Sequence, residues 1–229
     1  MKRSKNYLTK LNIKKEKYSL EESFQAVKEL SISKFDSNIE LHLSTIVDKK
    51  NPNRIIRGSI VYKHKFGNEK KILLLTEQKD LSENIKKLYD YIGSEEYIEK
   101  IANGWSEFDL IIATPDIMPK LGSIGRILGP KGLMPNPKTN TVTNNLKDVA
   151  ESYRKGKYDF KSDATGNIHL VIGKIDNSNT ELKDNFLEAI RSINTVLPKP
   201  ITQIVRNIFI CPTMGPSIKL NNNEITSII

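Results

Sequence analysis

The sequence predicts a mixed fold, in which an α+β domain is assembled from both chain ends and an α/β domain is inserted between them. In the middle of the chain, short apolar runs alternate with helical patterns, as is typical of a parallel sheet with helices on its faces. The two outer parts carry α+β patterns and share an excess of positive charge. The predicted borders place residues 1–65 and 157–229 in the split domain and residues 66–156 in the inserted domain.

The N-terminal part of the chain predicts one helix followed by one strand. Apolar residues recur at helical spacing over 20–30, and Ser19 can cap the first turn of this helix. Residues 39–47 alternate apolar and polar side chains, which predicts a strand with one buried face. The Asn51-Pro52-Asn53 run then indicates a turn or loop.

The middle part predicts two strands buried on both faces, with helices between them. The apolar runs at 71–76 and 109–114 have the length and composition of such strands. Helices are expected over 80–89 and 95–103, with 91–93 as a brief strand or turn between them.

The C-terminal part predicts two strands separated by a long helix. Strand patterns cover 168–175 and 201–211, and the helix runs from about residue 181 to residue 197. Two prolines, Pro198 and Pro200, end this helix because proline cannot continue it.

Positive charge is concentrated near the N-terminus. The chain holds 36 Lys and Arg against 27 Asp and Glu, a net charge of +9. Residues 1–65 hold 15 basic and 7 acidic side chains, residues 66–156 hold 13 of each, and residues 157–229 hold 8 and 7. Charge of one sign gathered in one region favours a polyanionic partner, although a solvated lysine-rich tail remains the alternative. No apolar run is long enough to span a bilayer, and no membrane partner is predicted.

Cysteine and histidine usage argues against a metal site or cofactor. The single Cys211 excludes an internal disulfide and any site built from several cysteines. The three histidines, His42, His64 and His169, are far apart in sequence and no HExxH motif occurs, so a catalytic zinc site is not expected.

The segment 122–143 is rich in glycine and proline, and its charged residues are all basic: Arg126, Lys131 and Lys138. Exposed backbone N–H groups beside such cations can hold phosphate oxygens. Neither GxxxxGK[ST] nor GxGxxG is present, so the usual signatures of nucleotide binding are missing. Spacing alone leaves two hypotheses open, contact with a polyanion or a rigid surface loop of purely structural role.

The run GRILGPKGLMPNPKTNTVT at 125–143 resembles the signature of the L-one family of large-subunit ribosomal proteins, in its bacterial and organellar form. Further matching runs follow the family's order: SKFD at 33–36, RG at 57–58, GW-x2-FDLIIATPDIM at 104–118, DATGNIH at 163–169 and TMGPS at 213–217. Two features depart from the family pattern. Asn140 stands where glycine is usual, and 48–71 matches poorly apart from RG.

The resemblance implies a split α+β domain that binds rRNA and an inserted, Rossmann-like, three-layer α/β domain. Phe35 could on local grounds belong to the core, but the resemblance implies a contact with RNA, where an aromatic ring can stack on a base. It also implies RNA contacts from Thr213, Met214, Gly215 and Ser217.

The loop 161–169 is a further RNA contact under this resemblance, through Asp163, Thr165, Gly166 and His169. Asp163 would accept a hydrogen bond from a base amino group, a ribose hydroxyl or the protein's own backbone. Phosphate contacts are expected from Arg3, Lys5 and Lys34, and a secondary contact with rRNA or tRNA from Arg126, Lys131 and Lys138.

The function implied is a non-catalytic rRNA-binding protein of the mobile stalk beside the tRNA exit site, which assists release of deacylated tRNA. Family members also repress translation of their own mRNA. A nucleotide-binding α/β enzyme and a polybasic anchor for an acidic partner protein or a membrane surface are the competing hypotheses. The match begins within the first few residues and leaves no room for a transit peptide. The expected location is therefore the bacterial cytoplasm, or a plastid or mitochondrion that encodes the protein.

Overall fold

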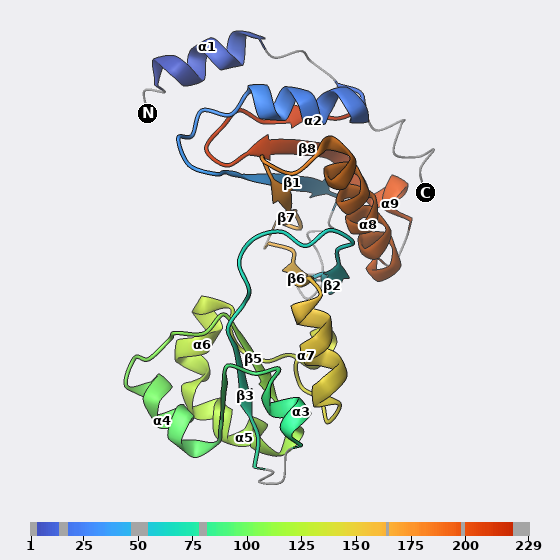
Figure 1. The fold of residues 1–229 in the computed structure, drawn as a ribbon. Helices are drawn as coiled ribbons and strands as arrows, with labels where there is room; N and C mark the ends of the chain where they lie inside the picture. The colour runs from blue at the N-terminus through green and yellow to red at the C-terminus, as the bar shows by residue number, and fades with distance from the viewer. Residues whose placement is uncertain are drawn as a thin grey trace. The chain divides into compact units, whose positions relative to one another are not determined.

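The computed structural model describes residues 4–13, 18–46, 55–77, 82–163, 165–197 and 200–221. Contacts between Cα atoms divide the chain into two compact units (Figure 1). The terminal unit comprises Met1–Gly67 and Tyr158–Ile229, and the middle unit comprises Asn68–Lys157. Both contain helices and strands, so the predicted mixed content is confirmed. No helix in the described ranges has the length and apolar character needed to cross a membrane.

The terminal unit is organised around a four-stranded antiparallel sheet in the order β7-β1-β8-β9. The strand β1, from the N-terminal part of the chain, lies between two strands from the C-terminal part. The chain ends are therefore joined by one hydrogen-bonded sheet. The bounds are β1 (Asn38–Thr45), β7 (Ile168–Lys174), β8 (Val205–Pro212) and β9 (Ile218–Lys219).

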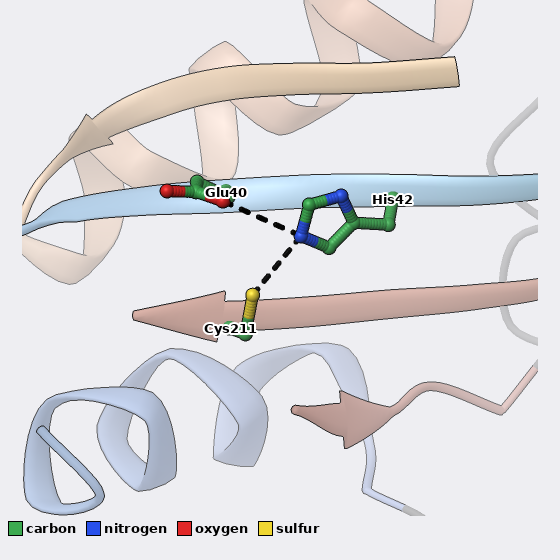
Figure 2. A group of neighbouring side chains, drawn as sticks. All are labelled: Glu40, His42 and Cys211. Atoms are coloured by element: carbon green, nitrogen blue, oxygen red, sulfur yellow. Dashed lines mark hydrogen bonds and ion pairs between the residues drawn. The ribbon is translucent and has the colours of Figure 1, made fainter. Parts of the chain in front are cut away.

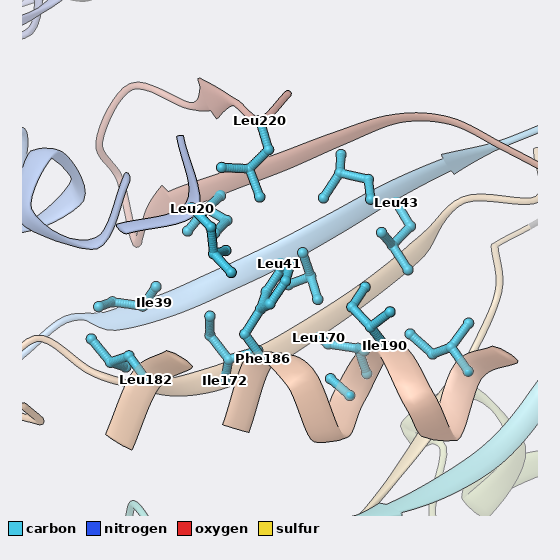
Figure 3. Packing of buried hydrophobic residues seen from close by; sticks show 14 of the residues in the cluster. Leu20, Ile39, Leu41, Leu43, Leu170, Ile172, Leu182, Phe186, Ile190 and Leu220 are labelled. Carbon is cyan, nitrogen blue, oxygen red and sulfur yellow. The ribbon is translucent and has the colours of Figure 1, made fainter. Parts of the chain in front are cut away.

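One face of this sheet is covered by helices α2 (Leu20–Glu29) and α8 (Asn179–Val196). Figure 3 shows Leu41 of β1 beside Phe186 of α8 in the resulting core. Both helices have side-chain caps at their N-termini, as Ser19 accepts from the backbone of Glu22 and Ser178 forms a capping box with Glu181. The predicted helix 20–30 and strand 39–47 thus occur with slightly shorter bounds.

The terminal unit contains one helix that was not predicted, and one predicted strand that is wrong in part. The basic N-terminal segment contains a helix, α1 (Lys5–Ile13), whose Lys10 ammonium donates to the carbonyl of Glu29. The predicted strand 201–211 starts as a helical turn, α9 (Ile201–Ile204), because the side chain of Asn194 accepts the N–H of Ile201 at 3.0 Å. The sequence also gave no sign of the two-stranded sheet formed by β2 (Arg57–Val61) and β6 (Lys157–Lys161).

The middle unit has a three-stranded parallel sheet in the order β4-β3-β5. All four residues of β3 are buried, since alternate side chains enter separate cores on its two faces. Helix α4 packs in one of these cores, and helices α3 and α7 contribute to the other. The bounds are β3 (Ile72–Leu75), β4 (Tyr91–Gly93), β5 (Leu110–Ala113), α3 (Glu83–Lys86), α4 (Glu95–Ala102) and α7 (Leu146–Arg154).

The segment 122–143 is a loop only in part, because residues 122–131 and 137–139 are helical whereas 132–136 and 140–143 are not. Its elements are the 3₁₀ turn η2 (Gly122–Ile124), helix α6 (Gly125–Lys131) and the 3₁₀ turn η3 (Pro137–Thr139). They follow η1 (Pro115–Ile117) and α5 (Met118–Leu121). Ile124 and Leu128 are buried one helical turn apart and hold the segment against the core. Asn140 ends η3 with a φ of 59°, a left-handed conformation that asparagine tolerates better than most residues, so glycine is not required there.

Asn185 of α8 is fully buried and makes three hydrogen bonds with the backbone. Its side chain accepts from the N–H of His64 and donates to the carbonyls of His64 and Ile172. We predict that Asn185→Leu lowers the free energy of unfolding by about 2 kcal/mol or more, because it leaves these groups without a partner. The matched control is Asn179→Ala at the exposed start of the same helix, which should change it by less than about 0.5 kcal/mol. Urea denaturation measures both, and equal effects would contradict this role.

Candidate nucleic-acid interface

The face of the four-stranded sheet opposite the helices carries a group of polar side chains, beside the half-buried Phe209 of β8. Because side chains alternate along a strand, burial of Ile39, Leu41 and Leu43 directs Glu40 and His42 to the other face. The strand register places Cys211 of β8 opposite Glu40, and His169 of β7 opposite His42. We call these four residues, Glu40, His42, His169 and Cys211, the polar face.

Apart from Arg3 and Lys5, the predicted RNA contacts of the terminal unit lie in three segments that border the polar face: residues 31–37, 163–169 and 213–217. We call these the rim segments. Thr213 follows β8 directly and its N–H donates to the carbonyl of Asn38, the first residue of β1, at 2.9 Å. Residues 31–37 lead into the same end of β1, and Asp163 contacts His169 of β7.

A chain of polar contacts crosses the polar face from one rim segment to another. The hydroxyl of Thr213 donates to Oε1 of Glu40 at 2.7 Å, and Oε2 of Glu40 lies 3.5 Å from Nε2 of His42. Nδ1 of His42 lies 2.8 Å from Nδ1 of His169, and Nε2 of His169 lies 3.6 Å from Oδ2 of Asp163. The structure therefore brings Thr213, His169 and Asp163, which the sequence analysis named separately, into one connected group.

The 213–217 segment has an unusual backbone. Met214 has a φ of 68°, which is rare for a long side chain, and the side chain is 78% exposed. Such a conformation costs about 1–2 kcal/mol for a residue other than glycine. Gly215 is explained by packing within the protein, since an added Cβ would lie 2.5 Å from Pro212 and 3.2 Å from the carbonyl of Leu30. Ser217 is half-buried.

Phe35 lies in the 31–37 rim segment with 58% of its surface exposed, so it is not a core residue. The neighbouring Lys34 is also exposed. The hydroxyl of Ser33 donates to the carbonyl of Phe35 at 3.1 Å and helps to fix the segment that presents the ring. A phenyl ring held in this way is available for stacking.

Asp163 organises the 163–169 rim segment from within. Its carboxylate accepts hydrogen bonds from the backbone of Thr165 and Asn167 and from the Thr165 hydroxyl, at 2.7–2.9 Å. One of the three partners expected for Asp163, the protein's own backbone, is thus seen to donate to it. Desolvation acts to raise the pKa of Asp163, but these hydrogen bonds outweigh it and the net pKa is lowered. The 163–169 rim segment is also hydrogen-bonded to β1, because the hydroxyl of Thr45 donates to the carbonyl of the buried Gly166.

Two residues of the polar face, His42 and Cys211, are held in uncharged forms. Desolvation lowers the pKa of His42, and the neighbouring His169 lowers it further, although Glu40 acts in the opposite direction. Desolvation also raises the pKa of the Cys211 thiol to about 11, with the charge of Glu40 as a second cause. At neutral pH His42 is thus unprotonated and Cys211 is a thiol.

The remaining predicted residues are basic. Lys5 is exposed on α1, and Arg3 lies outside the described residues. In the middle unit, Arg126 and Lys131 of α6 and Lys138 of η3 are all exposed. They form a group of their own, separate from the rim segments by sequence and by unit.

The sequence analysis missed Glu40, His42 and Cys211. The separation of the histidines in sequence was a poor guide, since strand pairing brings His42 and His169 into contact. The alternation in 39–47 does indicate that Glu40 and His42 share a face. The positions of His169 and Cys211 on that face follow only from the register of β7 and β8.

Comparison with known proteins gives a consistent set of relatives. The chain matches the model of the ribosomal protein L1p/L10e family over residues 27–216. Large ribosomal subunit protein uL1 of Persephonella marina is 42% identical over 227 residues, which cover 96% of this chain and 94% of that protein. The uL1 protein of Kosmotoga olearia is 37% identical, with 98% of each chain covered. That of Mesoplasma florum is 42% identical, covering 92% of this chain and 93% of its own.

These relatives are named as ribosomal proteins of a structural family and not as enzymes, in agreement with the expectation of a non-catalytic protein. The match of the family model extends from α2 to the 213–217 rim segment and so includes the polar face. The chain belongs to the ribosomal protein L1p/L10e family.

Proposed function

We propose that the chain is a structural protein of the large ribosomal subunit that binds rRNA through the polar face and its three rim segments. The main support is that segments which the family resemblance identified one by one border a single connected polar surface. The exposed, left-handed Met214 adds to this, because strained residues are retained where they serve a function.

Recognition in this proposal combines stacking with hydrogen bonds to sugars and base edges. Phe35 stacks on a base, an interaction worth about 1–3 kcal/mol. Glu40 and Asp163 repel phosphates but accept hydrogen bonds from ribose 2′-hydroxyl and base amino groups, which suits recognition of folded RNA. Lys34, in the 31–37 rim segment, contacts phosphates beside this surface, and Lys5 and, from the sequence, Arg3 supply further phosphate contacts.

We also propose that the two compact units act as separate domains, with the predicted borders at 65/66 and 156/157. The terminal unit is the main RNA binder, and the middle unit is a Rossmann-like domain that makes a secondary contact with rRNA or tRNA through Arg126, Lys131 and Lys138. Glycines around α6 support this contact. An added Cβ at Gly122, Gly125 or Gly129 would meet no atom within 4 Å, so packing inside the protein does not require glycine there.

The finer biological role follows the family. We propose that the protein forms the mobile stalk near the exit site of a bacterial-type ribosome, where it assists release of deacylated tRNA. We also propose that it represses translation of its own mRNA, with the messenger and the rRNA competing for the polar face. The competing function, a nucleotide-binding enzyme, has less support, since the phosphate-binding motifs are missing from the sequence and the relatives are ribosomal proteins.

We predict that Phe35→Ala and Met214→Gly each weaken binding to the stalk rRNA fragment by about 5- to 100-fold, equivalent to about 1–3 kcal/mol. Met214→Gly removes the side chain and also relieves the left-handed backbone, so the variant should be no less stable than the parent within about 1 kcal/mol. Filter binding and thermal unfolding measure the two effects.

The matched control is Val61→Ala, which shortens an exposed apolar residue of β2. Its affinity for the fragment should equal that of the parent protein. Loss of affinity in the control as large as in Phe35→Ala would contradict a specific contact, as would full affinity in Met214→Gly.

The phosphate contacts predict a graded dependence on salt. Affinity for the fragment should fall linearly on logarithmic axes as salt rises, and Lys34→Gln should make the slope shallower by about 0.7–0.9. Lys155→Gln, in the middle unit and close to Glu151, should leave the slope unchanged. Titrations at several salt concentrations measure these slopes. A flat profile for the parent protein would rule out phosphate contacts as the main source of affinity.

A further inference from the structure

The polar face also contains a group of potential metal ligands. Among the described residues, Glu40, His42 and Cys211 each offer one ligand atom, and these atoms all lie within 4.8 Å of one another (Figure 2). We propose that these three side chains bind a divalent transition-metal ion, with zinc as the best match. This site is additional to RNA binding, because neither proposal requires the other.

The donor set selects the class of ion. A thiolate, an imidazole nitrogen and a carboxylate oxygen together favour zinc and similar ions, whereas magnesium and calcium prefer oxygen ligands alone. Three protein ligands leave the fourth tetrahedral position open to water or to a group on a partner. The side chains of His42 and Glu40 are 27% and 30% exposed, so an ion can reach them from solvent.

The distances are close to those that a tetrahedral ion needs. Zinc bond lengths place neighbouring donor atoms about 3.4–3.6 Å apart. Nε2 of His42 lies 3.5 Å from Oε2 of Glu40 and 3.0 Å from Sγ of Cys211. Of these two pairs only the second must separate, by about half an ångström, and the third pair, a carboxylate oxygen of Glu40 and Sγ of Cys211, lies within 4.8 Å. Coordination breaks the S–H bond of Cys211, whose proton passes to solvent, and forms the metal–sulfur bond.

The backbone holds all three ligands in place. Glu40 and Cys211 are direct partners across β1 and β8, and His42 is two residues along β1 on the same face. The strand β1 is paired on both sides, so these positions are set by the sheet and not by a mobile loop.

Two of the ligands, Glu40 and His42, form hydrogen bonds with residues that do not bind the ion but orient the ligands, as is usual in metal sites. The hydroxyl of Thr213 donates to Oε1 of Glu40, which leaves Oε2 turned toward His42. Asp163 can accept the Nε2–H of His169, and Nδ1 of His169 then accepts the Nδ1–H of His42. This tautomer, assigned from the hydrogen-bond pattern, directs the lone pair of His42 Nε2 toward Cys211 and Glu40.

The first test is titration of the purified full chain with Co²⁺ and then Zn²⁺. We expect one equivalent of Co²⁺ to produce a thiolate-to-cobalt charge-transfer band, which Zn²⁺ removes by displacement. Cys211→Ser should abolish the band and weaken zinc binding at least tenfold. The control is His64→Asn, since His64 pairs with the carboxylate of Asp184 at 3.2 Å and should leave both results unchanged.

A second measurement uses the unmodified chain and does not depend on how the variants fold. Cys211 is the single cysteine in the sequence, so the rate of thiol alkylation reports on this site alone. One equivalent of Zn²⁺ should slow alkylation at least tenfold, while excess Mg²⁺ should not. An unchanged alkylation rate with Zn²⁺, or zinc binding by Cys211→Ser as tight as in the parent, would overturn the proposal.

Discussion

The pairing of β1 with β7 and β8 is the constraint on which the terminal unit depends. It joins residues that are more than 120 positions apart in the sequence into one sheet, in which Leu41 faces Leu170 and Ile210 across the strands. Burial of the apolar residues of β1 against α2 and α8 then fixes which face of the sheet belongs to the core. A shift of one residue in the register would bury Glu40 and His42, so the core and the polar face are specified together.

The polar face and the rim segments share the same few side chains. Thr213 ties the end of β8 to the start of β1 and also orients Glu40. Asp163 holds the 163–169 rim segment and contacts His169. Because each residue connects a rim segment to the sheet, the surface is already ordered in the chain alone. RNA binding therefore requires less ordering of the protein, which favours affinity. The ligands of the proposed metal site would be held in place by the same contacts.

Local patterns predicted most elements with strong periodicity. They failed for features whose conformation or position depends on contacts with residues far away in the sequence. Alternation in 39–47 and the apolar run at 71–76 were sufficient for β1 and β3. The sequence analysis did not predict α1, and it overlooked α7 although its buried residues Leu146, Val149, Ala150 and Tyr153 recur at helical spacing. It also missed the helical turn at Ile201, which depends on the side chain of Asn194. The rim segments were found only through the family resemblance, since no local pattern distinguishes Thr213 or Asp163. The position of Cys211 on the polar face depends on the strand register, which no sequence pattern predicts.

The central claim, that RNA binds at the polar face, is tested most directly by amide hydrogen exchange of the full chain with and without the stalk rRNA fragment. The account predicts slower exchange in residues 31–37, 163–169 and 213–217, with α8 unchanged because it packs on the opposite face of the sheet. Unchanged exchange in all three rim segments, with protection confined to residues 122–143, would contradict it.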